Sequence, residues 1–210
     1  MIRAAIADDH AIVRKGLRQV LSGEPDVEVV GEAANHGEVM QLVRQTACDV
    51  LILDIAMPGK NGIETLKQVK RELPKLPVLM LSTYPEEQYA IRALKAGAAG
   101  YLTKMTAAER IVEAVRQVAG GRKYVSAELA EALADSINRD NDVAPHEYLS
   151  DREFQTLRLI AMGRTLAQIG EEHALSPKTV SVYRARVVAK LGLHSNAELT
   201  RYALQHGLIE

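Results

Sequence analysis

The chain has 210 residues, 47% of them hydrophobic and 25% charged, which is the composition of an ordinary soluble globular protein with one or two domains. A single cysteine excludes an intramolecular disulfide and a cysteine-rich metal site, so a reducing cytoplasmic setting is expected. No apolar run approaches the roughly 20 residues that cross a membrane, and no membrane contact is expected. The net charge of −1 is unevenly spread: residues 149–210 carry 8 basic and 6 acidic side chains, whereas residues 121–148 carry 3 and 6.

Short apolar runs alternate with helix-period stretches through the first 120 residues. The predicted strands are residues 4–7, 27–30, 50–53, 78–81 and a short run within 100–104. In the first intervening helix, the apolar positions are Ile12, Val13, Leu17, Val20 and Leu21, and Gly31 is expected to end the second strand. Five strands alternating with five helices predict a doubly wound α/β fold with a five-stranded parallel sheet, in the strand order 2-1-3-4-5.

The pattern changes after Gly120. Residues 124–138 have the apolar spacing of a helix, and residues 139–147 are polar, charged and interrupted by Pro145, as in an exposed linker. From residue 149 onward there is no strand pattern, and four short helices are predicted at about 151–162, 165–174, 177–191 and 196–206. The expected organisation is therefore an α/β domain (1–120), a linker helix with a flexible linker (121–148) and an all-α domain (149–210).

Three carboxylates follow two strands that are neighbours in this order. Asp54 ends a strand whose four apolar residues indicate burial on both faces, and Asp8 and Asp9 end the first strand. Because ligands of open α/β sheets bind at the carboxyl ends of the strands, these side chains are expected to converge. Like charges that close favour a cation between them, and hard oxygen ligands on an open face suit Mg²⁺.

Two further strand ends can serve a phosphoryl group. Ser82 can donate a hydrogen bond to a phosphoryl oxygen, and Lys104 can reach the same group with its positive charge. With a cation present, the Asp54 carboxylate could accept a phosphoryl group despite the negative charge on both. His10, beside Asp9, is interpreted as a polar residue that opens the first helix and not as a catalytic base.

This combination resembles the receiver domain of two-component response regulators. The resemblance covers residues 3–120 and consists of Asp-Asp after strand one, Asp-x-x-Met-Pro-Gly after strand three, Ser-Thr after strand four and Tyr-x-x-Lys after strand five. It implies that Asp54 takes phosphate from a phosphohistidine on a sensor histidine kinase. It further implies an Mg²⁺ site made of Asp9, Asp54 and the carbonyl of Ala56, with Asp8 acting through water. In the family Ser82 and Lys104 would bind the phosphoryl oxygens, and Tyr101 would turn inward when Ser82 moves. Many receivers have proline after the lysine, whereas this chain has Met105.

The C-terminal helices fit a helix-turn-helix. Ser150 and Glu153 form a predicted capping box, and a three-residue turn precedes Pro177 at the start of the third helix. That helix has one apolar face, expected to be buried, and a basic, small-residue face able to reach DNA phosphates and base edges. The candidate DNA-binding residues are Lys178, Thr179, Ser181, Val182, Arg184, Ala185, Arg186 and Lys190.

Residues 149–208 resemble the LuxR-type DNA-binding domain of the NarL/FixJ regulators. The motifs are Leu-Ser-x-Arg-Glu, Gly163, Ile169-Gly170, Leu-Ser-x-Lys-Thr-Val and Lys190-Leu191-Gly192, and the run from Thr179 to Arg184 is similar to the BvgA/UvrY-like branch. The resemblance implies that helix 177–191 enters the major groove of double-stranded DNA and that helix 196–206 supports a homodimer. A two-fold dimer predicts an inverted-repeat site, and RNA polymerase is a further possible partner.

The expected function is a cytoplasmic transcription factor switched by phosphorylation of Asp54. It would not be an enzyme, beyond Mg²⁺-dependent self-phosphorylation and slow autodephosphorylation. One alternative is a phosphatase with an aspartyl-phosphate intermediate, but Ala56 stands where a second acid would be needed, two residues after Asp54. Another alternative is a regulator that binds DNA or a partner protein without phosphorylation. The acidic site argues against this second alternative, which a comparison of both states on DNA would decide.

Overall fold

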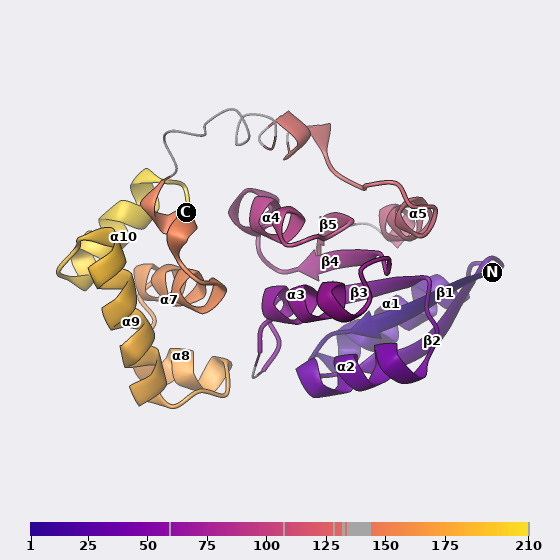
Figure 1. The fold of residues 1–210 in the computed structure, drawn as a ribbon, viewed down its shortest axis with the longest axis horizontal. Helices are drawn as coiled ribbons and strands as arrows, with labels where there is room; N and C mark the ends of the chain where they lie inside the picture. Colours follow the sequence, from indigo (N-terminus) through magenta and orange to yellow (C-terminus); the bar gives the residue numbers. More distant parts are fainter. Residues whose placement is uncertain (59, 107, 128, 132, 134–143, 210) are drawn as a thin grey trace. The chain divides into compact units, whose positions relative to one another are not determined.

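The computed structural model describes residues 1–58, 60–106, 108–127, 129–131, 133 and 144–209 (Figure 1). The chain divides into two compact units, residues 1–133 and 134–210. Among the described residues, no helix is both long and apolar enough to cross a membrane.

The N-terminal unit is built on one parallel sheet. Its strands are β1 (Ile2–Ala7), β2 (Val27–Ala33), β3 (Val50–Asp54), β4 (Val78–Ser82) and β5 (Gly100–Thr103). They pair in the order β2-β1-β3-β4-β5, all parallel, which confirms the predicted topology. Every residue of β3 and β4 is buried, as expected for central strands covered on both faces.

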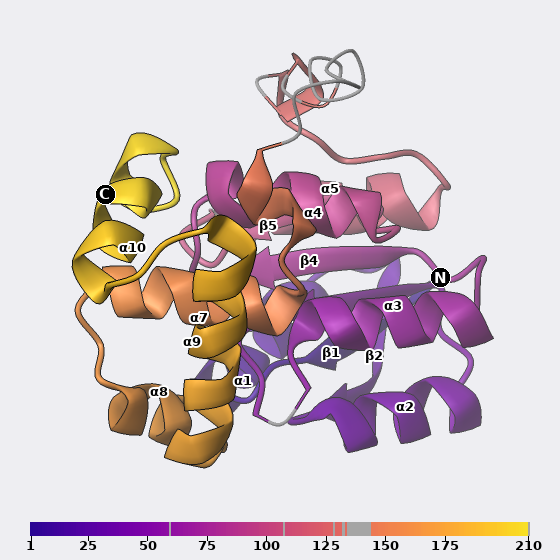
Figure 2. The same cartoon turned by 60° about the vertical axis from the view of Figure 1, so that its left-hand side comes forward.

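Helices cover both faces of this sheet (Figure 2). They are α1 (Ala11–Ser22), α2 (His36–Gln45), α3 (Gly62–Glu72), α4 (Glu86–Lys95) and α5 (Ala108–Ala119). One face carries α1 and α5, whose buried residues, among them Leu21 and Val115, form a single core with Ile6 and Ile52 of the central strands. The opposite face carries α2 and α3, which contact each other, while α4 contacts β5.

The strand register places the residues that carry function at one edge of the sheet. Ala7 at the end of β1 lies opposite Leu53, Asp54 opposite Leu81, and Ser82 opposite Thr103. The segments that follow β1, β3, β4 and β5 therefore start level with one another.

Two local predictions are wrong, each because of packing. Strand β2 continues through Gly31 to Ala33, so this glycine does not end the strand. Gly31 packs against the side chain of Leu42 in α2, which would have to move to admit a Cβ. Ile12, predicted to belong to the buried stripe of α1, is 82% exposed. It lies in the first turn of α1, where the buried residues begin only at Leu17.

The segment after α5 also differs from expectation. Tyr124, predicted as helical, forms an isolated parallel bridge with Gly100 of β5, and its N–H donates to the Ala99 carbonyl at 2.9 Å. The Lys123 ammonium donates to the carbonyl of Ala98 at 2.5 Å. Helical residues begin at Ala127, but most of the rest of the predicted helix and of the linker falls on residues 128, 132 and 134–143, outside the described residues.

The C-terminal unit is helical, as predicted. It contains a 3-10 turn, η1 (Pro145–Tyr148), and the helices α7 (Asp151–Ala161), α8 (Leu166–Glu172), α9 (Pro177–Leu191) and α10 (Asn196–Gln205). The predicted capping box of Ser150 and Glu153 is present, and α7 is followed by Gly163 at φ 83°. Between α8 and α9, the turn has Ala174 in the left-handed region (φ 52°), and a Cβ on Gly170 would meet the Leu175 carbonyl at 2.6 Å.

The last part of the predicted exposed linker belongs to this unit. In η1, Nδ1 of His146 lies 3.0 Å from the Tyr202 hydroxyl of α10, and its ring also contacts Phe154 and His206. Aromatic contacts with α7 and α10 explain why these residues form a turn on the helices, although their polar composition favoured a linker.

Candidate phosphoryl-acceptor site and DNA-binding face

Asp8, Asp9, Asp54 and Lys104 come together at the carboxyl end of the sheet. Asp8 and Asp54 are buried, and Asp9 is half-buried. The Lys104 ammonium lies 2.6 Å from Asp8 Oδ2 and 2.9 Å from Asp54 Oδ2, so it bridges the carboxylates of two neighbouring strands. Strand order alone predicts this convergence, but the lysine bridge appears only in the structure.

The charged groups of this site shift one another's pKa. Burial raises the pKa of Asp54 to about 6, and the charge of Asp8 adds to the rise, whereas Lys104 and the Ala56 N–H oppose it. Burial would lower the pKa of Lys104, but the charge of Asp54 and hydrogen bonds to both carboxylates outweigh burial and raise it. The lysine therefore stays charged, and the Asp54 carboxylate is the group whose charge is costly.

The donor set fits a small divalent cation. One donor atom from each of Asp8, Asp9, His10 and Asp54 can be chosen so that all four lie within 4.8 Å of one another. Oδ1 of Asp54 is buried and has no hydrogen-bond partner among the described residues. A buried carboxylate oxygen without a donor is unfavourable unless a cation or water meets it, so the residues present are compatible with Mg²⁺.

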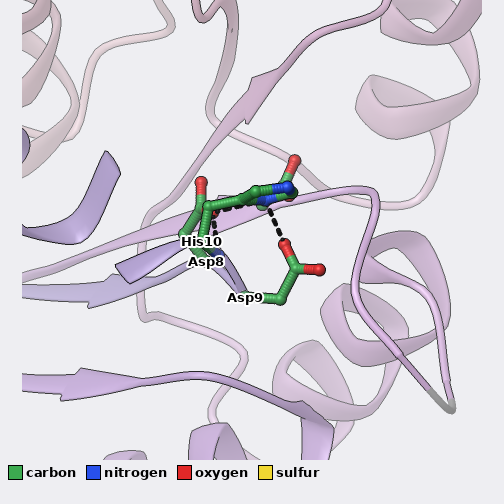
Figure 3. Close-up of side chains that lie close together, drawn as sticks. Asp8, Asp9 and His10 are labelled. Atoms are coloured by element: carbon green, nitrogen blue, oxygen red, sulfur yellow. Dashed lines mark hydrogen bonds and ion pairs between the residues drawn. The ribbon is translucent and has the colours of Figure 1, made fainter. Parts of the chain in front are cut away.

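His10 opens α1, as interpreted from the sequence, and its side chain also lies at this site. It occupies the position before α1 but makes no capping hydrogen bond with its side chain. Instead its Nδ1 lies 2.6 Å from Asp9 Oδ1 and 3.4 Å from Asp8 Oδ1, and Figure 3 shows the imidazole joined to both residues. The sequence position of His10, directly after Asp8 and Asp9, could have indicated that its side chain lies at the site, because neighbouring loop residues share one environment.

The predicted switch residues lie next to one another, with Tyr101 already inward. Tyr101 is 2% exposed, and its hydroxyl donates to the Tyr84 carbonyl at 2.8 Å. The buried Ser82 hydroxyl accepts a hydrogen bond from the Tyr84 N–H at 3.1 Å. Tyr84 therefore connects the two through its backbone, a role that the sequence did not reveal because main-chain bonds leave no residue-type signature.

Five of the predicted DNA-binding residues share the exposed side of α9. Val180 and Val187 are buried, while Lys178, Ser181, Val182, Ala185 and Arg186 are exposed, as the spacing predicted. Thr179 is half-buried and its N–H donates to the Ser176 cap.

Two cations of this helix are held within the unit. Arg184 Nε donates to Asn196 Oδ1 at 2.7 Å, and Lys190 Nζ lies 2.6 Å from Glu153 Oε2 in α7. DNA contact by these two residues stays a prediction and would require them to exchange or share their partners.

Comparisons with known proteins agree with both halves of this description. The family "Response regulator receiver domain" matches residues 4–116, and "Bacterial regulatory proteins, luxR family" matches residues 147–203. The chain is 37% identical to the response regulator UvrY of Escherichia coli (strain K12), over 99% of this chain and 96% of UvrY. It is 36% identical to the response regulator GacA of Pseudomonas aeruginosa, over 100% of this chain and 99% of GacA.

Solved structures show the same architecture. One is the structure of RcsB from Salmonella enterica serovar Typhimurium bound to promoter rprA in the presence of phosphomimetic BeF3-. It is 27% identical and has a TM-score of 0.64, over 96% of this chain and 97% of RcsB. A LuxR-family response regulator from Aurantimonas is 32% identical with a TM-score of 0.60, over 66% of this chain and 99% of that one. The chain therefore belongs to the DNA-binding two-component response regulators of the NarL/FixJ family, which control transcription through a receiver domain and a LuxR-type helix-turn-helix domain.

Proposed function

We propose that Asp54 accepts a phosphoryl group from a phosphohistidine on a sensor histidine kinase. The observation that carries the proposal is the buried Asp54 carboxylate, with one oxygen bonded to Lys104 and the other without a hydrogen-bond partner among the described residues. A carboxylate oxygen of Asp54 attacks phosphorus, the phosphorus–nitrogen bond of the phosphohistidine breaks, and the imidazole leaves with its electron pair and takes up a proton.

The residues of this chain supply most of what the transfer needs. Asp9, Asp54 and the Ala56 carbonyl would hold Mg²⁺, with Asp8 acting through water, and the ion would neutralise charge on the transferred group. Lys104 bonds a phosphoryl oxygen once it leaves Asp54, and Ser82 supplies a hydroxyl donor. Slow autodephosphorylation follows if water reaches the aspartyl phosphate.

The signal passes from the acidic site through Ser82 and Tyr101. If the Ser82 hydroxyl turns toward the phosphoryl group, it gives up the bond from the Tyr84 N–H that it holds at 3.1 Å. The carbonyl of Tyr84 accepts a hydrogen bond from the Tyr101 hydroxyl, so a movement of either Ser82 or Tyr101 changes the contacts of the segment before α4. Phosphorylation thereby stabilises one of two states of the receiver unit. This state releases the DNA-binding domain, favours a homodimer, or both.

On DNA, the exposed face of α9 reads the major groove. Lys178, Thr179, Ser181, Val182, Ala185 and Arg186 form its reading face, with Arg184 and Lys190 at phosphates. The RcsB relative is described as bound to promoter DNA and as forming dimers, which supports a homodimer on an inverted-repeat site for this chain. The protein acts in the cytoplasm and can contact RNA polymerase, and its domains are residues 1–120 and 149–210, joined by the linker helix and flexible linker of residues 121–148.

The phosphoacceptor is tested by labelling the full chain with a small acyl phosphate and Mg²⁺. Asp54→Asn should take up no phosphoryl group by intact mass, whereas Asp49→Asn, at the opposite end of β3 and paired with Arg3, should label like wild type. Labelling of the Asp54→Asn protein would refute the assignment. Turnover of many organic phosphate molecules per chain would favour the phosphatase alternative instead.

The DNA-binding face is tested by measuring affinity for specific and unrelated DNA against salt concentration. Arg186→Ala should weaken binding to both and reduce the salt slope by about one. Arg122→Ala, which removes the same charge from an exposed position after α5, should not. Mapping of bound DNA across the genome with and without phosphorylation then separates a phosphorylation-controlled regulator from one that needs no phosphate.

A further inference from the structure

His10 brings a nitrogen donor to a site otherwise made of carboxylates (Figure 3). Its backbone N–H donates to Asp8 Oδ1 at 2.8 Å, which fixes the residue beside the cluster. Its Nδ1 lies 2.6 Å from Asp9 Oδ1 and 3.4 Å from Asp8 Oδ1. The carboxylates, and not the helix, orient this imidazole, because the side chain makes no capping bond to α1.

The 2.6 Å distance is that of a direct contact between the imidazole and the Asp9 carboxylate. Donor atoms about 2.0–2.2 Å from a first-row divalent ion lie roughly 3–3.6 Å apart, so Nδ1 and Oδ1 need to separate by less than about 1 Å to share one ion. The donor atoms of Asp8, Asp9, His10 and Asp54 all lie within 4.8 Å. A second observation points to a ligand at the same place: Asp54 is fully buried, and its Oδ1 has no hydrogen-bond partner among the described residues.

The nitrogen changes which ion the site prefers. Mg²⁺ favours oxygen ligands and waters, whereas imidazole favours Zn²⁺ and the other later first-row ions. We propose that His10 Nδ1 is a ligand for a transition ion of the Zn²⁺ type at the acidic site, so that His10 sets the choice between such an ion and Mg²⁺. This inference rests on the proposed function of the same carboxylates in holding Mg²⁺.

His10 acts in opposite senses on the two ions. Without metal, Nδ1 of the imidazole lies 2.6 Å from Asp9 Oδ1, and Mg²⁺ must displace the ring from this oxygen in order to use it. For Zn²⁺, the ring proton is on Nε2 and the Nδ1 lone pair becomes a ligand, so the same ring adds to affinity. A Zn²⁺ ion held by His10 with Asp9 and Asp54 occupies the oxygens that Mg²⁺ needs, and it therefore slows phosphorylation.

The test measures the affinity of the full chain for Zn²⁺ alone and for Mg²⁺ alone, by calorimetry at neutral pH, without phosphodonor. His10→Ala should weaken Zn²⁺ binding at least about tenfold, while Mg²⁺ binds as well as in wild type or more tightly. His10→Gln keeps a side chain able to bond Asp9 but supplies no imidazole, so it should lose Zn²⁺ affinity to the same extent. In wild type, the ¹⁵N resonance of His10 Nδ1 should shift on adding Zn²⁺ and not shift in the same way with Mg²⁺.

Controls separate this site from others. His194→Ala removes an exposed imidazole of the C-terminal unit and should leave the acidic-site affinity unchanged, whereas Asp54→Asn should weaken both ions. Zn²⁺ binding that His10→Ala does not weaken overturns the proposal, and so does an equal loss of both ions, which is the result of a purely structural role. Failure of wild type to bind Mg²⁺ counts against the proposed function, while the Zn²⁺ comparison still decides the role of His10.

Discussion

Gly62, the first residue of α3, is predicted to be costly to replace because it lies against the backbone that carries Asp54. A Cβ at this position would lie 2.7 Å from Ile55 Cα and 2.8 Å from the carbonyl carbon of Asp54, with the Asp54 oxygen closer still. Carbon atoms in good contact are about 3.5–4.0 Å apart, so the added methyl is about 1 Å too close. None of these neighbours is a side chain that could rotate away.

The cost follows from that overlap. Adding a methyl group to a packed region costs about 1–3 kcal/mol, and rigid backbone neighbours place Gly62→Ala near the upper end, about 3 kcal/mol. For a chain of this size the melting temperature of the N-terminal unit should fall by roughly 6–12 °C. Because β3 must shift to make room, phosphorylation of Asp54 should slow as well.

Gly16→Ala is the matched control. Gly16 lies inside α1 and a Cβ there meets nothing within 4 Å, so the alanine should stabilise the unit by about 0.5–1 kcal/mol through helix propensity. Both variants are measured by thermal unfolding of the full chain, with hydrogen exchange of β3 amides to assign the change to the N-terminal unit. A Gly62→Ala protein as stable as wild type would refute the reasoning from backbone contact.

Three further predictions concern charge and the segment after α5. In metal-free buffer at neutral pH, Asp54→Asn should stabilise the N-terminal unit by on the order of 1–2 kcal/mol, because it removes a buried charge whose pKa is raised to about 6; urea unfolding that shows a loss of stability would contradict this. Burial, with the charge of Arg152, lowers the pKa of His173 to about 4, so the folded protein binds fewer protons than the unfolded chain. The stability from neutral His173 is complete above its ordinary pKa of 6.5 and is lost as pH falls toward 4, and unfolding midpoints of His173→Gln should fall less over that window than those of wild type. Gly100→Ala should free Tyr124 from β5, because its Cβ would meet the Tyr124 carbonyl at 2.6 Å; exchange of the Tyr124 amide should quicken, but not in Gly120→Ala, whose nearest contacts are at 3.4 Å.

Local pattern accounts for most of the fold. A short apolar run such as residues 50–53, followed by Pro58 and Gly59, favours an interior strand. A right-handed crossover between parallel strands leaves few possible orders, so the sheet order followed from the alternation of elements. The same reasoning placed Asp8, Asp9 and Asp54 at one edge, since residues at strand ends inherit the position of their strands. Helix caps such as Ser150 with Glu153 were predictable because both partners lie within four residues.

Side-chain partners distant in the chain were not predictable in this way. Lys104 meets Asp54 across 50 residues, and Lys190 meets Glu153 across 37. Periodicity says which face of an element a residue occupies, but not which group lies opposite it, so Arg184 and Lys190 were assigned to DNA without their partners inside the unit.

The amino-acid order thus specifies the parallel sheet, the helix-turn-helix and the strand ends that carry the acidic residues, because hydrophobic period, turn residues and caps act over a few positions. Folding in three dimensions decides that Lys104 bridges Asp8 and Asp54, that His10 turns onto Asp9 and not onto its helix, and that Tyr124 joins β5. These contacts form only after the sheet has brought its strand ends together. Burial and charge then determine which side chains pair.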